Sequence, residues 1–109
     1  MSNYEIKYYI TDKGNALIKD WLYSLDKINQ KRVLLRLNRL KYGNFGDFKK
    51  INQYIYELRF NFGSGYRIYY TLKDNQIVLL ISGGDKKTQS KDIKYATEIV
   101  ESMKGRNNG

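Results

Sequence analysis

The stretch YIYELRFNFGSGYRIYYT, residues Tyr54–Thr71, decides the fold because it predicts two antiparallel strands joined by a glycine-rich turn. Apolar or aromatic side chains occupy every even position on both sides of the turn, which is the period of a half-buried strand. A one-residue slip would turn one strand over, so even positions meet even positions only if an odd number of residues is looped out. The turn is therefore centred on Gly63.

The same register places Arg59 opposite Arg67 on the other face of the hairpin. Two arginines at facing positions repel each other, so the pair adds nothing to folding. It is compatible with two interpretations, namely side chains that splay into solvent or a paired-guanidinium site for a phosphate, whose geometry arginine matches. We favour the anion site.

The composition indicates a single domain over residues 1–109, with 41% hydrophobic and 15% aromatic residues for one modest core. The chain has no cysteine and no histidine, which excludes thiolate chemistry and makes us expect neither a metal nor another cofactor. The N-terminal residues lack an apolar signal core and no apolar run is long enough for a membrane, so we expect a cytoplasmic protein without a membrane partner.

The charge balance favours a nucleic acid or another acidic surface as the partner. Lysine and arginine number 20 against 11 acidic residues, a net charge of +9. Because histidine is absent, acid–base chemistry near neutral pH must come from Lys, Tyr, Asp or Glu, or be replaced by electrostatic stabilisation.

The remaining periodic segments surround the hairpin. In chain order they are a strand over residues 4–10, a helix over 13–25 capped by Thr11 or Asp12, a helix from the cap Asp26 to about Tyr42, a strand over 76–82, and a helix from Thr88 or Ser90 to Met103. Gly43 stops the second helix, and the final GRNNG is expected to be a frayed tail.

The second predicted helix is strongly basic. Its expected inward residues are Ile28, Val33, Leu34, Leu37 and Leu40. Arg32, Arg36 and Arg39 share another face, which is either a solvated surface or a stripe that contacts the ribosomal RNA backbone without reading bases. Lys49 and Lys50, before the central hairpin, are open to the same two interpretations.

A two-residue turn at Asp74 and Asn75 would bring Arg67 opposite Ser82 on the following strand. Arg59, Arg67 and the loop Gly83–Lys87 then lie side by side at one end of three strands. This loop opens into the last helix, so its backbone N–H groups could receive an anion beside Lys86 and Lys87.

The element order, together with ELRF followed by GYRIYY and the segment GGDKKTQSKDI, resembles the RelE/HigB family of toxins of toxin–antitoxin systems, in its HigB-type branch. The resemblance covers nearly the whole chain. It implies an α+β microbial ribonuclease fold, β-α-α-β-β-β-α, with an antiparallel sheet packed on helices. It also implies a ribosome-dependent mRNA endoribonuclease that needs no metal, and a cognate antitoxin, here a HigA-like helix-turn-helix protein.

Within this resemblance, Arg67 matches the phosphate-binding arginine of the family and Arg59 a basic position on the preceding strand. Lys86 or Lys87 matches a basic residue after the last strand. We expect Arg67 and Arg59 to stabilise charge on the phosphate, Lys86 to neutralise or protonate the leaving oxygen, and Asp85 to act as the base or to orient Lys86. Where related toxins carry Tyr or His, this chain has Thr88 and Gln89, which leaves the acid and the base open.

Two other functions remain compatible with the sequence. One is a toxin of the ParE kind, which has the same fold and poisons a topoisomerase without cutting RNA. The other is an RNA-binding or ribosome-binding protein whose basic face carries no chemistry.

Overall fold

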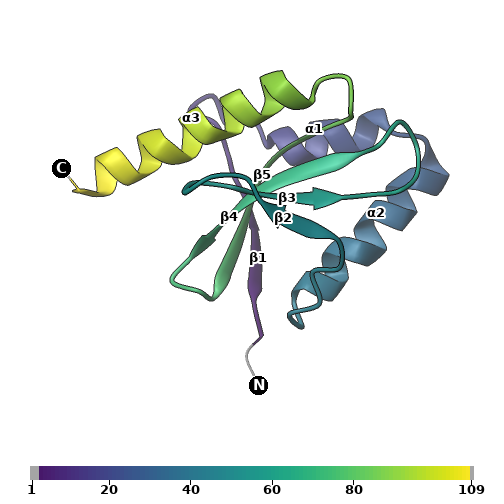
Figure 1. The fold of residues 1–109 in the computed structure, drawn as a ribbon, viewed down its shortest axis with the longest axis horizontal. Coiled ribbons are helices and arrows are strands. Elements are labelled where there is room, and N and C mark those ends of the chain that lie inside the picture. Colours follow the sequence, from purple (N-terminus) through teal and green to yellow (C-terminus); the bar gives the residue numbers. More distant parts are fainter. Residues whose placement is uncertain (1–2, 109) are drawn as a thin grey trace.

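The computed structural model describes residues 3–108, which form five strands and three helices (Figure 1). In chain order these are β1 (Glu5–Tyr8), α1 (Leu17–Ser24), α2 (Lys27–Leu40), β2 (Phe48–Lys50), β3 (Tyr56–Arg59), β4 (Arg67–Lys73), β5 (Ile77–Gly84) and α3 (Gln89–Asn108). The predicted α+β fold class is confirmed.

The strands form one sheet in the order β1-β5-β4-β3-β2. The first strand lies at a sheet edge and runs parallel to β5, so the sheet is mixed and not antiparallel as expected. The sheet also contains β2, a strand that the sequence did not predict. Three exposed residues are too few to show a period of two, and β2 is defined by its pairing with β3 alone.

The central hairpin has the predicted register. Leu58 pairs with Ile68 and Arg59 with Arg67 across β3 and β4. Gly63 at the centre of the turn has a φ of +63°, and a Cβ there would lie 2.2 Å from the ring of Tyr66. Both the backbone conformation and the close ring require glycine at this position.

The register between β4 and β5 differs from the prediction. Asp74 and Asn75 do form the turn, both with a φ of +55°, but the ladder closes at Lys73 and Ile77. A bulge between Tyr69 and Tyr70 shifts the pairing by one further residue, so Arg67 lies opposite Gly84 instead of Ser82. The sequence gives no sign of the bulge, because β5 is apolar on both faces and an extra residue leaves that pattern unchanged.

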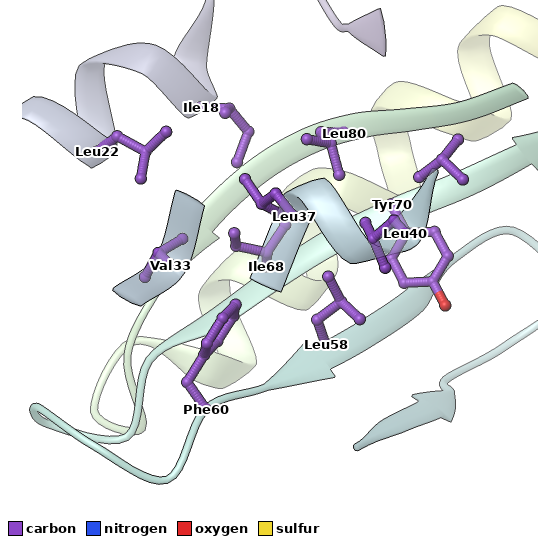
Figure 2. Packing of buried hydrophobic residues seen from close by; sticks show 11 residues of the cluster. Ile18, Leu22, Val33, Leu37, Leu40, Leu58, Phe60, Ile68, Tyr70 and Leu80 are labelled. Carbon is purple, nitrogen blue, oxygen red and sulfur yellow. The ribbon is translucent and has the colours of Figure 1, made fainter. Parts of the chain in front are cut away.

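The two faces of the sheet carry separate hydrophobic cores. The core under α1 and α2 is made by Ile18, Leu22, Val33, Leu37, Leu40, Leu58, Phe60, Ile68, Tyr70, Val78 and Leu80 (Figure 2). The core under α3 is made by Ile55, Tyr69, Leu79, Ile81, Ala96 and Val100. The strand predicted over residues 76–82 is therefore covered on both sides, as its apolar composition indicates.

The observed helix boundaries agree in part with the predicted ones. Asp26 caps α2 as predicted and accepts a hydrogen bond of 2.8 Å from the backbone of Asn29. Helix α1 begins four residues later than predicted, because the side chain of Thr11 accepts from the backbone of Asn15 and the chain closes a turn before the helix. Helix α3 continues to Asn108, through most of the predicted frayed tail, whose last residue lies outside the described range.

Two of the residues expected inside α2 lie outside. Val33, Leu37 and Leu40 are buried, but Ile28 is 73% exposed and Leu34 is 45% exposed. A stripe of three buried residues already fills the contact with the sheet, so the two others remain on the outer surface.

In the described part of the chain, no helix is long and apolar enough to cross a membrane.

Candidate functional site

The candidate site is built around the carboxylate of Glu57, which lies on β3 and is fully buried. One of its oxygens accepts from Nε of Arg59 at 3.0 Å and from Nη1 of Arg67 at 3.2 Å. The other accepts from the side-chain amide of Gln89, in the first turn of α3, at 2.9 Å. The two facing arginines therefore share one counter-charge, which overcomes the repulsion expected from their register.

The hydrogen bonds keep this buried carboxylate ionised. Burial alone would raise the pKa of Glu57, but the hydrogen bonds from Arg59 and Gln89 and the charge of Arg67 outweigh burial and lower the pKa. Because water does not reach Glu57, this side chain holds the two arginines in place from behind.

The two arginines differ in how much of the side chain reaches solvent. Arg59 is 37% exposed, whereas Arg67 is 15% exposed. Arg59 contacts Glu57 through Nε, and its two terminal nitrogens make no hydrogen bond within the described residues. Those nitrogens form a guanidinium edge that a phosphate can approach from solvent. Arg59 is thus the more accessible arginine, and Arg67 lies behind it.

Several polar atoms beside this cluster have no partner. Tyr69 faces Glu57 on β3 and Ser82 on β5, so all three side chains lie on the α3 face of the sheet. The hydroxyl of Ser82 and Nε of Arg67 are buried without a hydrogen bond among the described residues, and the buried hydroxyl of Tyr69, although close to Glu57, makes no well-formed hydrogen bond with it. Burial and the neighbouring negative charge of Glu57 raise the pKa of Tyr69. Three such groups together are unusual in a region that serves folding alone.

The loop before α3 does not have the free N–H groups that the sequence suggested. The carboxylate of Asp85 accepts from the backbone N–H groups of Lys87 at 2.9 Å and Thr88 at 3.2 Å, and from the hydroxyl of Ser64 at 3.1 Å. Burial would raise the pKa of Asp85, but the hydrogen bonds from Thr88, Ser64 and Lys87 lower it. Asp85 caps this loop, so the predicted anion site on its backbone is wrong.

The predicted convergence of the loop with the arginines is present in the backbone. Gly84 pairs with Arg67, which itself pairs with Arg59. The backbone N–H of Lys86 donates to the carbonyl of Ser64 in the hairpin turn at 3.3 Å. Lys86 and Lys87 are both exposed, so two lysines follow the strand end next to the arginine pair.

The two lysines of the edge strand β2 point to opposite faces. Lys49 pairs with Glu57 and therefore faces the arginine cluster. Lys50 pairs with Tyr56, and its Nζ lies 5.9 Å from the centre of that ring. Lys49 extends the cluster of positive charge, whereas Lys50 lies on the other side of the sheet.

The three arginines of α2 do not form one binding stripe. Arg36 donates to the backbone carbonyls of Arg59, Phe45 and Asp47, and its guanidinium lies 4.6 Å from the ring centre of Phe60. Burial lowers the pKa of Arg36, and the negative charge of Asp47, which raises this pKa, offsets only part of the effect. Arg36 thus holds the strand that carries Arg59.

The other two arginines of α2 are exposed. The guanidinium of Arg32 lies 3.9 Å from the ring centre of Phe62 in the hairpin loop. Arg39 makes no side-chain hydrogen bond or ion pair within the described residues. These two remain candidates for contact with a phosphate backbone.

Sequence reasoning missed the roles of Glu57 and Gln89. A usable signal for Glu57 was present, because an acid two residues before Arg59 lies on the same face of the strand, beside Arg59 and diagonal to Arg67. No comparable signal exists for Gln89, whose position depends on how α3 packs. No group of three or more His, Cys, Asp or Glu side chains that could hold a metal occurs in residues that the structure describes.

Two comparisons with known proteins find a match. Residues 20–104 match the family described as phage-derived protein Gp49-like (DUF891). The chain is also 43% identical over 92 residues to an uncharacterized protein of Haemophilus influenzae, an alignment that covers 84% of this chain and 93% of that relative.

Proposed function

The chain belongs to the Gp49-like family of phage-derived proteins, a toxin-like family, and on that premise we propose that it is a RelE/HigB-type toxin that cuts mRNA on the ribosome. Its α+β fold and its +9 charge are consistent with such an activity. A cognate antitoxin would hold the protein inactive in the cell.

One observation carries this proposal. A buried carboxylate orients two facing arginines, and the more exposed one keeps two nitrogens unoccupied in the described structure. Replacing a buried ion pair by apolar residues of similar volume is often neutral or stabilising, so stability alone is a weak reason for these charges. A preorganised guanidinium pair at the end of the strands instead suits a phosphate whose negative charge increases during a reaction.

In the proposed reaction, the ribose 2′-OH beside the scissile bond attacks the adjacent phosphorus. The bond from phosphorus to the 5′ oxygen breaks, which leaves a 2′,3′-cyclic phosphate and a 5′-OH. The proton lost by the 2′-OH is balanced by the proton that the 5′ oxygen gains. Arg59 and Arg67 stabilise the charge on the non-bridging oxygens, each by roughly 3 kcal/mol.

The lysines beside the cluster have secondary roles in this proposal. Lys86 is exposed next to Gly84 and Asp85 and would neutralise the leaving oxygen. Asp85 orients that lysine through the capped loop, because both of its oxygens already accept hydrogen bonds. Lys49 and Lys87 would hold neighbouring phosphates of the mRNA. Catalysis then depends on electrostatic stabilisation more than on a strong base.

The decisive experiment incubates the purified protein with translating ribosomes and maps new mRNA ends. We expect ends with a 5′-OH at defined codon positions, and none with naked mRNA. The matched control is Lys73→Ala, which removes an exposed basic side chain at the end of β4 opposite to Arg67 and should leave cutting unchanged. Unbroken mRNA, together with inhibition of a topoisomerase, would instead identify a toxin of the ParE kind. Ribosome binding without either activity would identify a binder.

A further inference from the structure

The β2 end of the sheet carries a cluster of aromatic rings that reaches from the core to solvent. Tyr70, which is buried in the core under α1 and α2 (Figure 2), is stacked with two other rings. Its ring centre lies 5.2 Å from that of Tyr56 and 5.8 Å from that of Phe45. Phe48, on β2, lies 5.8 Å from Phe45 and 6.5 Å from Tyr56, and it is 50% exposed. The cluster therefore ends in a ring that is half open to water.

Folding alone does not account for the exposed half of Phe48. Strand β2 is the outermost strand of the sheet on this side and pairs with β3. Lysines on an edge strand discourage pairing with another chain, as Lys49 and Lys50 do here, but an exposed phenylalanine beside them counteracts that protection. A ligand that covered the ring would gain binding free energy that folding leaves unused.

The charges beside Phe48 are mainly positive. Lys50 projects to the same face of β2 as Phe48, because alternate residues of a strand share a face, and its Nζ lies 5.9 Å from the ring centre of Tyr56. Asp47 is the nearest acid along the chain, and the guanidinium of Arg36, which donates to the backbone carbonyl of Asp47, offsets its charge. An aromatic face next to a lysine matches an unpaired nucleobase and the phosphate attached to it.

We propose that Phe45, Phe48, Tyr56 and Lys50, which together we name the Phe48 platform, bind an unpaired base of a single-stranded RNA. The base stacks on the open face of Phe48, and Lys50 contacts a neighbouring phosphate. Every base has an aromatic face, so the platform tolerates different sequences. An RNA duplex keeps its bases stacked inside and offers no free face. A second copy of this chain would bring the β2 lysines of one molecule against those of the other.

The Phe48 platform and the arginine cluster meet at the β2 edge. Phe48 pairs with Leu58, the residue before Arg59, and Lys49 pairs with Glu57 on the arginine side of the sheet. An RNA strand that passes around this edge reaches both faces. The proposal rests on the proposed function only in that the RNA would then be mRNA. In that case, the platform holds a base near the scissile phosphate and contributes to substrate affinity, not to the chemical step.

The test measures binding of the full chain, without ribosomes, to an oligouridylate of about nine nucleotides with one central 2-aminopurine. Stacking of this fluorescent base on an aromatic ring quenches its emission, so we expect the fluorescence to fall on binding. The same RNA annealed to its complement, and a strand of equal length that lacks the bases but keeps the phosphates, should each bind at least about tenfold more weakly. Amide chemical shifts of the isotope-labelled chain should change along β2.

Matched variants separate stacking from packing and from charge. Phe48→Leu keeps an apolar side chain but removes the ring, so binding should weaken about tenfold and the quenching should disappear. Phe48→Tyr keeps the ring and should bind within about twofold of the native protein. Tyr23→Leu removes another exposed ring, 76% exposed at the end of α1, and should change nothing. Lys50→Gln should reduce the salt slope of binding by about 0.7.

Four results would overturn the proposal. They are equal binding by Phe48→Leu and Tyr23→Leu, equal affinity for single-stranded RNA and for the strand without bases, a preference for the duplex, or self-association that Phe48→Leu abolishes while RNA binding stays unchanged. Because the assay measures binding without ribosomes, its failure would leave mRNA cutting untested and unaffected, and a protein that does not cut mRNA could still bind a base on Phe48.

Discussion

Nη1 of Arg67 lies 3.2 Å from the carboxylate of Glu57, a side chain that is completely removed from water. Glu57 also accepts from Arg59, the residue that faces Arg67 on the neighbouring strand. One buried negative charge therefore fixes two positive charges whose register alone would drive them apart. This arrangement makes Glu57 important for stability, and it makes the arginines important for any chemistry on phosphate.

The first prediction concerns Glu57→Gln. The substitution keeps the shape and removes the charge, so Arg59 and Arg67 lose their common partner. We expect the free energy of unfolding to fall by about 2–3 kcal/mol, which is less than for a fully buried pair because Arg59 reaches solvent. Urea unfolding measures the change, and Glu98→Gln on the exposed surface of α3 is the control. Equal stability of the two variants would show that the carboxylate is not needed.

The second prediction is the pH dependence of stability. The folded state lowers the pKa of Glu57 below its ordinary value of 4.5, so its ionised form stabilises the fold. This contribution is complete above pH 4.5 and is lost as the pH falls through the folded pKa. The difference in unfolding free energy between the native protein and Glu57→Gln should therefore shrink on acidification. Asp85 also has a lowered pKa, but it is present in both proteins and cancels. A difference that stays constant down to pH 2.5, about two units lower, would contradict this assignment.

The third prediction separates the two arginines. Arg59→Ala and Arg67→Ala should each reduce mRNA cutting by about a hundredfold or more and abolish growth arrest. Their effects on stability should differ, because Arg67 is 15% exposed and Arg59 is 37% exposed. We expect losses of about 1–3 kcal/mol for Arg67→Ala and below about 1 kcal/mol for Arg59→Ala. If Arg67→Ala folds and remains fully toxic, Arg67 has no part in the mechanism.

The parts of the fold that were predictable are those with a local pattern. The even-position alternation around Gly63 determined the register of β3 and β4, and the cap at Asp26 determined the start of α2. The bulge at Tyr69 was not predictable, because a strand buried on both faces shows no period that an extra residue would disturb. Strand β2 has only three residues, which is too short to show the alternation of a strand.

The candidate site was predictable only as a set of positive charges. The register brought Arg59 and Arg67 together, and the order of the strands added the loop that follows Gly84. Long-range contacts decided the rest. Gln89 donates to Glu57, although 32 residues separate them in the chain. Arg36 was expected on a binding stripe, but its guanidinium donates to the backbone carbonyl of Arg59. Helix periodicity places Arg36 on a face but does not show which neighbours occupy that face.

The fourth prediction divides the basic residues of α2 by their contacts. Arg32→Glu with Arg39→Glu should weaken ribosome association and reduce its salt dependence by a slope of about 1–2, since fewer counterions are released from RNA. Cutting at saturating ribosome should not change.

Arg36→Ala is the contrasting variant on the same helix. It should instead lower thermal stability, because three backbone carbonyls each lose the hydrogen bond from Arg36. If the double variant binds ribosomes with the native affinity and salt slope, the exposed arginines of α2 are only a solvated surface.

The last prediction concerns the antitoxin. A protein that cuts the messages of its own cell must be blocked, so we expect a neighbouring gene to encode an antitoxin that restores growth and co-purifies as a stable complex. If the antitoxin binds the outer surface of the α1–α2 hairpin, Leu34→Asp should remain toxic but escape the antitoxin, because Leu34 is exposed on α2, on the other side of the sheet from α3. Tyr95→Asp should be neutralised normally. A Leu34→Asp toxin that is still blocked would place the antitoxin on another surface, whereas a harmless native protein with no binding neighbour would contradict the toxin assignment itself.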